Sequence, residues 1–227
     1  MKKRIFYTEL AYLAGLAVLA LGAAMMTRAD FGVSMIVAPA YVLHLKVSQT
    51  LPFFTFGMAE YTLQAALLIA MCLVLRRFRI AYLFSFVTAV LYGFMLDGSL
   101  LLLSFVSMES LALRFVFYLA GMVLGALGVS LLFHTYIAPE VYELFVKEVS
   151  AKLCKDISKV KTVYDCVSCL AAVGMSFAFF GLWHFEGVQW GTIVCALVNG
   201  WLIGRATALL RKRFDFRDAK NWRKHFE

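Results

Sequence analysis

A chain of 227 residues in which 63% are hydrophobic and only 16% are charged, with a mean hydropathy of +0.81, has the composition of a membrane protein. Its formal net charge is +8, but the basic residues stand at the ends of apolar runs and form no groove-sized basic face. This distribution excludes the nucleic-acid-binding proteins that a basic chain otherwise suggests.

Apolar runs long enough to cross a membrane follow one another along the chain. Five of them hold 17 to 19 uncharged residues, and a sixth contains a single carboxylate, Glu60. In chain order they are Leu10–Thr27, Leu51–Leu75, Ile80–Leu96, Phe115–Phe133, Cys166–Trp183 and Gly187–Gly204. About 20 apolar helical residues span a hydrocarbon core of roughly 30 Å, whereas outer-membrane strands alternate over runs of about ten. The sequence therefore predicts an all-α membrane protein with six transmembrane helices.

The first apolar run returns in the second half of the chain. GLAVLALGAAMM at Gly15–Met26 and GMVLGALGVSLL at Gly121–Leu132 share Gly, Ala, Leu and Gly in register. Two further pairs match at offsets of 105 to 107 residues: Thr55–Leu68 with Lys159–Val173, and Ser85–Leu96 with Thr192–Ile203. Because the counterpart of the first run is internal, we interpret the basic and apolar N-terminus as a retained first helix and not as a cleaved signal peptide.

Each repeat holds three spans, so the second copy enters the membrane from the opposite side. The sequence thus predicts two inverted three-helix repeats, related by a pseudo-twofold axis in the membrane plane. We assign residues 1–108 to the first repeat, residues 109–210 to the second, and residues 211–227 to a basic, aromatic cytoplasmic tail.

Small residues spaced four apart predict where helices approach closely. Such pairs stand at Gly121 and Gly125 and at Gly200 and Gly204, with a weaker equivalent at Ala20. We expect the first and fourth spans to cross near the pseudo-twofold axis.

After its first span, each repeat contains a stretch that does not span. The stretch in the first repeat, 31–47, is mostly apolar, whereas the one in the second, 137–157, has apolar residues every four positions with Glu and Lys between them. The latter pattern predicts an amphipathic helix, with Pro139 in its first turn. Each short helix either lies flat at the interface or re-enters the membrane with its N-terminus in a cavity.

Lys and Arg are distributed unevenly about the spans. With the N-terminus inside, 19 of the 22 lie in inner segments and only Arg28, Lys46 and Arg114 lie in outer ones. Basic loops are held on the cytoplasmic side by anionic lipid and by the insertion machinery. The sequence therefore predicts a multi-pass protein of the bacterial cytoplasmic membrane with both termini cytoplasmic.

Polar residues at membrane depth are the candidates for a solute or coupling site, because a charge there costs several kcal/mol without a partner. Glu60 is the hardest to explain structurally, and Gln64 lies one turn further on the same helix face. Asn199 stands mid-span beside a glycine. Arg28, Asp97 and Asp165 complete the set: the first two can reach Glu60, and Asp165 is its counterpart in the second repeat. If the protein is a transporter, we expect Glu60 to face a polar cavity closed by the 31–47 segment.

The stretch ALGAAMMTRADFGVSMIVAP, a span ending in RRFR and the closing Gly93-x-x-x-Asp97 resemble the YczE/YitT-like bacterial membrane proteins. The likeness extends from about Gly15 to Leu210. Two departures stand out: Met35-Ile36-Val37 replaces a Pro–Trp–Asp-like triplet, and Ile137-Ala138-Pro139-Glu140 is a degenerate form of the family's second-repeat turn. The resemblance implies the fold more than a chemistry.

Two functions of different classes fit these features. The first is a secondary transporter for an unidentified small solute, with a buried carboxylate coupling proton movement to it. The second is a membrane scaffold whose aromatic, basic tail binds a partner protein or anionic lipid. No catalytic motif, metal-ligand cluster or cofactor-binding motif is present in the sequence, so we expect no enzymatic activity, no metal and no cofactor. The expected partners are the lipid bilayer, a small solute or a protein.

Overall fold

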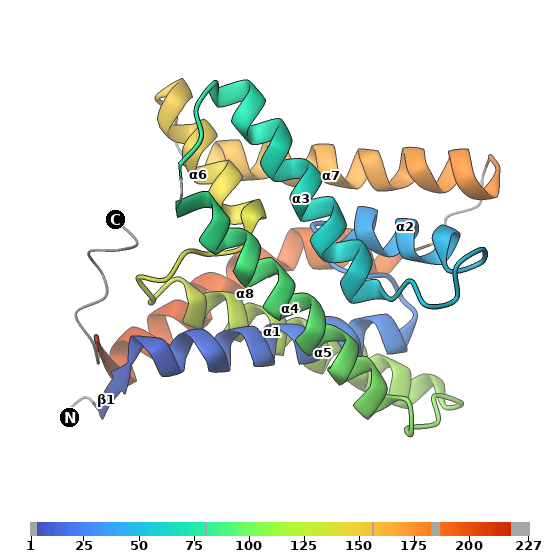
Figure 1. The fold of residues 1–227 in the computed structure, drawn as a ribbon. Helices are drawn as coiled ribbons and strands as arrows, with labels where there is room; N and C mark the ends of the chain where they lie inside the picture. The colour runs from blue at the N-terminus through green and yellow to red at the C-terminus, as the bar shows by residue number, and fades with distance from the viewer. Residues whose placement is uncertain (1–3, 80, 156, 183–186, 219–227) are drawn as a thin grey trace.

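A computed structural model describes residues 4–79, 81–155, 157–182 and 187–218. These residues form eight α-helices and two short strands (Figure 1). Their bounds are β1 Arg4–Tyr7, α1 Thr8–Ala29, α2 Ala38–Val47, α3 Phe56–Leu75, α4 Ala81–Leu103, α5 Leu111–Leu132, α6 Val141–Leu153, α7 Ile157–Phe180, α8 Trp190–Arg213 and β2 Phe214–Arg217. The prediction of an all-α fold is confirmed, with the two strands as a small addition at one end.

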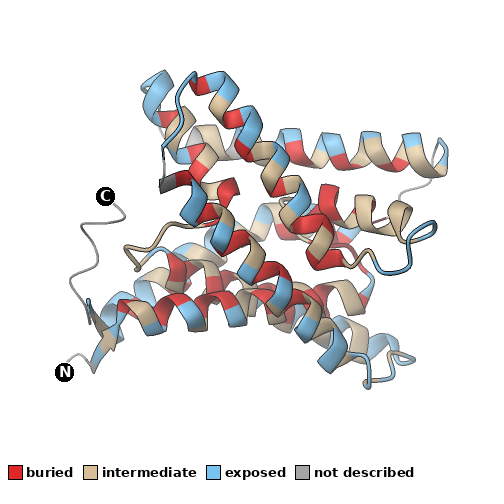
Figure 2. Ribbon diagram, viewed as in Figure 1, coloured by how far each residue is buried: buried red, intermediate tan, exposed pale blue. Residues whose placement is uncertain are grey.

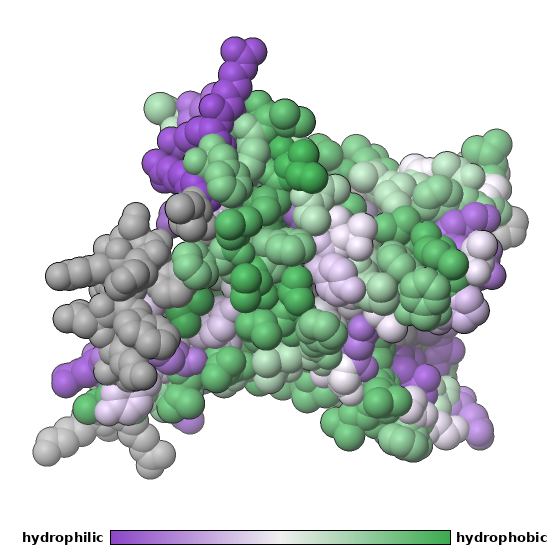
Figure 3. Space-filling view, in the orientation of Figure 1, coloured by the Kyte–Doolittle hydropathy of each residue, from purple (hydrophilic) through white to green (hydrophobic). Residues whose placement is uncertain are grey.

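Six of the helices, α1, α3, α4, α5, α7 and α8, are long and apolar enough to cross a membrane. Their outward residues are apolar as well: Leu73, Leu170 and Leu197 are each more than 70% exposed. Apolar surface covers the middle of the visible face, and polar residues gather toward its two ends (Figure 3). Buried residues lie where the helices face one another (Figure 2). The chain is therefore a polytopic membrane protein, because such an apolar exterior is stable only in lipid.

The helices α1 and α5 form the most extensive contact in the molecule, and glycines allow it. A Cβ added at Gly22 would lie 2.6 Å from the Gly125 amide nitrogen and 2.7 Å from the Gly121 carbonyl oxygen. The expected contact between the first and fourth spans is confirmed. The expected close approach at Gly200 and Gly204 is wrong, because a Cβ at either position would meet nothing within 4 Å among the described atoms.

The short helix α6 lies alongside α3 and runs in the same direction (Figure 1). The Val141 amide at its start donates to Gln64 Oε1 at 3.0 Å, and Lys152 Nζ near its end donates to the Val74 carbonyl. Gln64 precedes the end of α3 by 11 residues, or about 16 Å. α6 therefore begins beside the middle of α3 and ends near the end of α3.

The other short helix, α2, packs between α3 and α7. Its first residues, Ala38 and Ala40, are fully buried, whereas Lys46 near its end donates to the Phe179 carbonyl at the end of α7, at 3.2 Å. α2 therefore also runs from the interior of the bundle to an edge.

The two ends of the described chain meet in a two-stranded parallel sheet, in which Phe6 pairs with Phe216. This sheet lies beside the start of α1 and the end of α8 (Figure 1). Of the tail assigned to 211–227, the first three residues extend α8 and the next four form β2. The remainder, from residue 219, lies outside the described residues.

Candidate functional site

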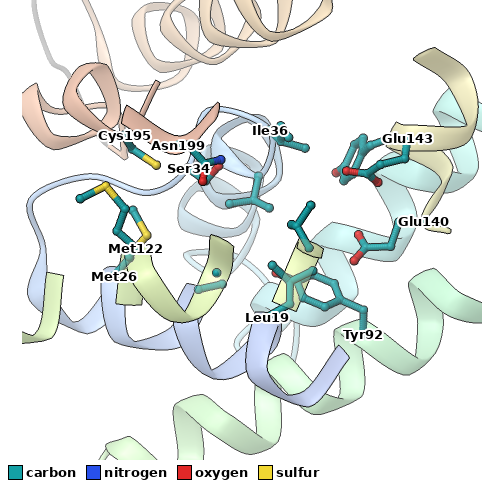
Figure 4. A pocket seen from close by; sticks show the side chains of 15 residues that line it. Leu19, Met26, Ser34, Ile36, Tyr92, Met122, Glu140, Glu143, Cys195 and Asn199 are labelled. Atoms are coloured by element: carbon teal, nitrogen blue, oxygen red, sulfur yellow. The ribbon is translucent and has the colours of Figure 1, made fainter. Parts of the chain in front are cut away.

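A cavity of about 70 Å³ lies among α1, α4, α5, α6, α8 and the segment before α2. It has room for about five water molecules at roughly 15 Å³ each. Its wall is mostly apolar, with side chains such as Leu19, Met122 and Val129. A few polar groups converge on it, among them the carboxyls of Glu140 and Glu143 (Figure 4). Apolar walls with a few convergent polar groups are common in small-molecule sites, although this cavity is much smaller than the usual range of about 300–1,000 Å³.

Two related sequences bring the starts of the short helices to this cavity. Val37-Ala38-Pro39 leads into α2 and Ile137-Ala138-Pro139 leads into α6, 100 residues later. Proline suits a helix start because its φ is already helical and its missing N–H would have no partner there. This match indicates in the sequence where the two short helices begin. Its offset of 100 residues differs from the offsets of 105 to 107 that relate the spans.

Glu140 is the N-cap residue of α6, although its side chain makes no capping hydrogen bond, and it is only 5% exposed. Its Oε2 accepts a hydrogen bond from Gln64 Nε2 at 3.1 Å, and its Oε1 has no partner among the described residues. Figure 4 shows its carboxyl directed into the cavity. Burial raises the pKa of Glu140 well above its ordinary value, and the nearby carboxyls of Glu143 and Glu60 raise it further. Glu140 therefore holds a proton more tightly than a carboxyl in water.

Glu60 contacts the same Gln64 side chain as Glu140 and is completely buried. Its Oε2 accepts from the Tyr142 hydroxyl at 2.9 Å and from Gln64 Nε2 at 3.5 Å, and its Oε1 has no described partner. Glu60 does not itself line the cavity. Gln64 connects the two carboxyls, because its Nε2 contacts both and its Oε1 holds the first amide of α6.

Glu143, one turn into α6, lines two cavities. Besides the central one, it borders a wider cavity of about 440 Å³ that Lys147 and Lys161 also line. Burial raises the pKa of Glu143, and the positive charge of Lys161 opposes this effect. Glu143 is thus the one acidic side chain common to both spaces among the described residues.

The cavity wall opposite these carboxyls carries neutral polar groups. Ser34, from the segment before α2, and Asn199, from α8, both line it there (Figure 4). Tyr92 of α4, only 1% exposed, closes the cavity from below in the same view. The cavity therefore has an acidic side and a neutral polar side, with apolar side chains between them.

The structure brings together only some of the residues that the sequence singled out. Glu60 and Gln64 are in contact. Asn199 lines the cavity on the side opposite Glu140. Glu140 itself, Glu143, Tyr142, Ser34 and Tyr92 were not in the predicted set.

The remaining three candidates have local partners elsewhere in the fold. Arg28 donates from Nη2 to the Val106 carbonyl at 2.7 Å, and its Nε is buried without a described partner. Asp165 forms an ion pair with Lys161, one turn earlier on α7, at 3.6 Å. Asp97 accepts from the Thr55 hydroxyl at 2.6 Å and from the Gly57 amide at 2.8 Å, and so joins α4 to the start of α3.

Replacing Asp97 with Ala is expected to destabilise the protein by about 2 kcal/mol, because it leaves the Gly57 amide and the Thr55 hydroxyl without their acceptor. Thr55→Ala removes only the helix cap to the Met58 amide and one partner of Asp97, and is expected to cost about 1 kcal/mol. Unfolding of both variants in detergent, followed by circular dichroism, measures the difference. Equal stability of Asp97→Ala and the wild type would show that this junction does not hold α3 and α4 together.

Comparison with known proteins places the chain in one family. The sequence model of a family of unknown function, DUF6198, matches residues 6–208, which include both short helices and all but the last five residues of the six candidate spans. No curated protein and no solved structure matches the chain, and no named relative confirms the resemblance to YczE/YitT-like proteins. Because the match covers most of the sequence, the protein belongs to the DUF6198 family.

Proposed function

We propose that this protein is a proton-coupled secondary transporter for a small solute, built from two inverted repeats. The observation that carries the proposal is the central cavity, where two short helices begin and where the buried carboxyl of Glu140 has an oxygen without a described partner. In broken-helix transporters, solute and coupling ions bind at such interrupted helices near the membrane midplane.

The helix contacts support the inverted repeats. In the predicted pairing, α1, α2, α3 and α4 correspond to α5, α6, α7 and α8. The contact of α2 with α7 then corresponds to that of α6 with α3, and the contact of α1 with α4 to that of α5 with α8. The first helices of the two repeats, α1 and α5, pack directly against each other through glycines. A pseudo-twofold axis that passes between these two helices requires such a contact.

The two cavities suggest how a solute reaches the site. The wider cavity, with Lys147 and Lys161, lies on the side that the positive-inside rule makes cytoplasmic, and it shares Glu143 with the central cavity. Movement of α6 about its start, where Gln64 holds the Val141 amide, would open or close this connection. The corresponding movement of α2 would act from the outer side.

The carboxyls supply the proton coupling. An ionised carboxylate buried without a positive partner is too costly, so Glu60 and Glu140 are neutral when the cavity is empty. A solute or water that reaches Glu140 lowers the cost of ionising its carboxyl and allows the proton to leave. Coupling then follows because proton release and solute binding occur at the same side chain.

The proposal places the protein in the bacterial cytoplasmic membrane with both termini inside, and topology reporters test this orientation. Fusions after Lys46, Arg77, Lys155 and Gly187 are expected to report outside, inside, inside and outside, because basic loops are retained in the cytoplasm. A reversed signal at any one of the four positions would contradict the inverted arrangement.

Transport itself is tested with purified protein in vesicles that contain a pH-sensitive dye. A pH gradient is imposed and small cations, anions and neutral solutes are added one at a time. We expect one class to drive proton flux that protein-free vesicles do not show. If no solute of any class moves protons, the protein is not a proton-coupled transporter, and the scaffold function becomes the better account.

A further inference from the structure

Resting on the proposed function, the geometry points to a solute class: we propose that the central cavity binds a small organic ammonium ion between the carboxyls of Glu140 and Glu143, in exchange for protons. The cation would lie with its N–H groups toward these carboxyls and its alkyl part against the apolar wall. The site is made of described residues on α1, α4, α5, α6 and α8, together with Glu140 and the segment before α2.

The charge of the cavity wall favours a cation. Two carboxyls line it, and no Lys, Arg or His does so in the described part of the chain. Glu140 is only 5% exposed, and its carboxyl is directed into the cavity (Figure 4). The Oε1 of this carboxyl has no hydrogen-bond partner among the described residues. An unpaired acceptor in this position lacks a hydrogen-bond donor, and an ammonium ion supplies both donors and the opposite charge.

The helix starts offer little to an anion, although their dipoles point toward the cavity. At α2, the amides of Val37 and Ala38 both donate to the Ser34 carbonyl, and Pro39 has no N–H. At α6, the Val141 amide donates to Gln64 Oε1. Three of the backbone donors that could bind an anion at these helix starts are therefore already occupied, and the position of Pro39 offers none.

The wall suits an organic cation better than a metal ion. Metal sites need several oxygen, nitrogen or sulfur ligands at short range, and the described residues contain no group of three or more His, Cys, Asp or Glu with that arrangement. Leu19, Ala23 and Val129 instead offer apolar contacts for methyl or methylene groups, and Tyr92 presents an aromatic ring. The volume of about 70 Å³ limits the ligand to a few heavy atoms.

Exchange with protons follows from the surroundings of the two carboxyls. Glu140 is faced by titratable groups from four helices: Tyr12 of α1, Glu60 of α3, Tyr92 of α4, and Tyr142 and Glu143 of α6. Glu143 is faced in addition by Lys161, Tyr164 and Asp165 of α7. Lys161 is the only positive group among these and already pairs with Asp165, so burial dominates and raises the pKa of Glu140. A carboxyl buried without a positive partner favours its neutral form. Each ammonium ion that binds must displace a proton.

The test measures methylammonium binding to the purified protein by calorimetry, and methylammonium-driven proton efflux from vesicles. We expect binding to release protons, and its apparent affinity to fall by about tenfold for each unit that the pH is lowered, because one proton competes with each cation below the pKa of the carboxyl. Protein-free vesicles measure the leak of the neutral amine.

Glu140→Gln and Glu143→Gln are expected to abolish both signals, since each removes a negative charge from the site. Glu109→Gln makes the same chemical change in an exposed loop, where Glu109 accepts a hydrogen bond from the Ser107 hydroxyl. This variant is expected to keep wild-type binding. Should Glu140→Gln fail to fold, Glu143→Gln alone decides, because Glu143 is neither a cap nor a partner in the α3 contact.

The outcomes separate this inference from the proposed function. If acetate or urea drives proton flux and methylammonium neither binds nor drives it, the ammonium site is overturned while the transporter stands. If methylammonium binds equally well to Glu140→Gln and Glu143→Gln, the carboxyls are not its site and the inference is also overturned. If no solute moves protons, the transporter proposal fails and the ammonium proposal fails with it.

Discussion

Replacing Glu60 with Gln will abolish proton-coupled transport and leave the fold intact. Gln has the shape of the protonated carboxyl and can still accept a hydrogen bond from the Tyr142 hydroxyl. The free energy of unfolding should therefore change by no more than about 1 kcal/mol. It cannot lose or gain a proton, however, and it is joined through Gln64 to the carboxyl that faces the cavity. The measurement pairs thermal unfolding in detergent with dye-reported proton flux in vesicles.

Glu109→Gln is the matched control for this variant as well, because it removes a carboxylate of the same type from the surface. Proton flux at the wild-type rate in Glu60→Gln would show that Glu60 is a structural residue, with its hydrogen bond to Tyr142 as its whole role. In that case a rise in stability would be expected, since the variant no longer carries the desolvation cost of a buried carboxyl.

Replacing Gly22 with Ala will destabilise the protein by about 3 kcal/mol, because the added methyl group must enter the α1–α5 seam. Its Cβ would lie 2.6 Å from the Gly125 nitrogen and 2.7 Å from the Gly121 oxygen. Both are backbone atoms, which cannot turn aside as a flexible side chain does. The two helices must therefore separate along their most extensive contact.

Gly200→Ala is the matched control, since Gly200 belongs to a similar small-residue pair but has open space where its Cβ would stand. It is expected to be neutral or to stabilise α8 by up to about 1 kcal/mol, the difference in helix propensity between Gly and Ala. Unfolding in the same detergent compares the two variants. If Gly22→Ala is as stable as Gly200→Ala, the seam is not closely packed in solution.

The amphipathic pattern of 137–157 predicts a helix but leaves its orientation open between a flat and a re-entrant position. The structure places α6 along α3 through two contacts far apart in sequence, Gln64 with Val141 and Lys152 with Val74. Neither contact is visible in the periodicity of α6. A polar glutamine one turn after a buried glutamate is, in retrospect, the signal that something polar must meet α3 at that depth.

The sequence by itself determined the six spans, the all-α class and the contact of α1 with α5, because these depend on local hydrophobicity and on small residues within one helix. Only the tertiary structure decided which polar groups meet. It joined Glu140 and Glu60 through Gln64 and bonded Asp97 to the start of α3. It also left open space, among the described atoms, where a Cβ at Gly200 would lie. The physical reason is that a helix's apolar character is set residue by residue, whereas the partner of a buried polar group depends on where distant helices cross and at what depth.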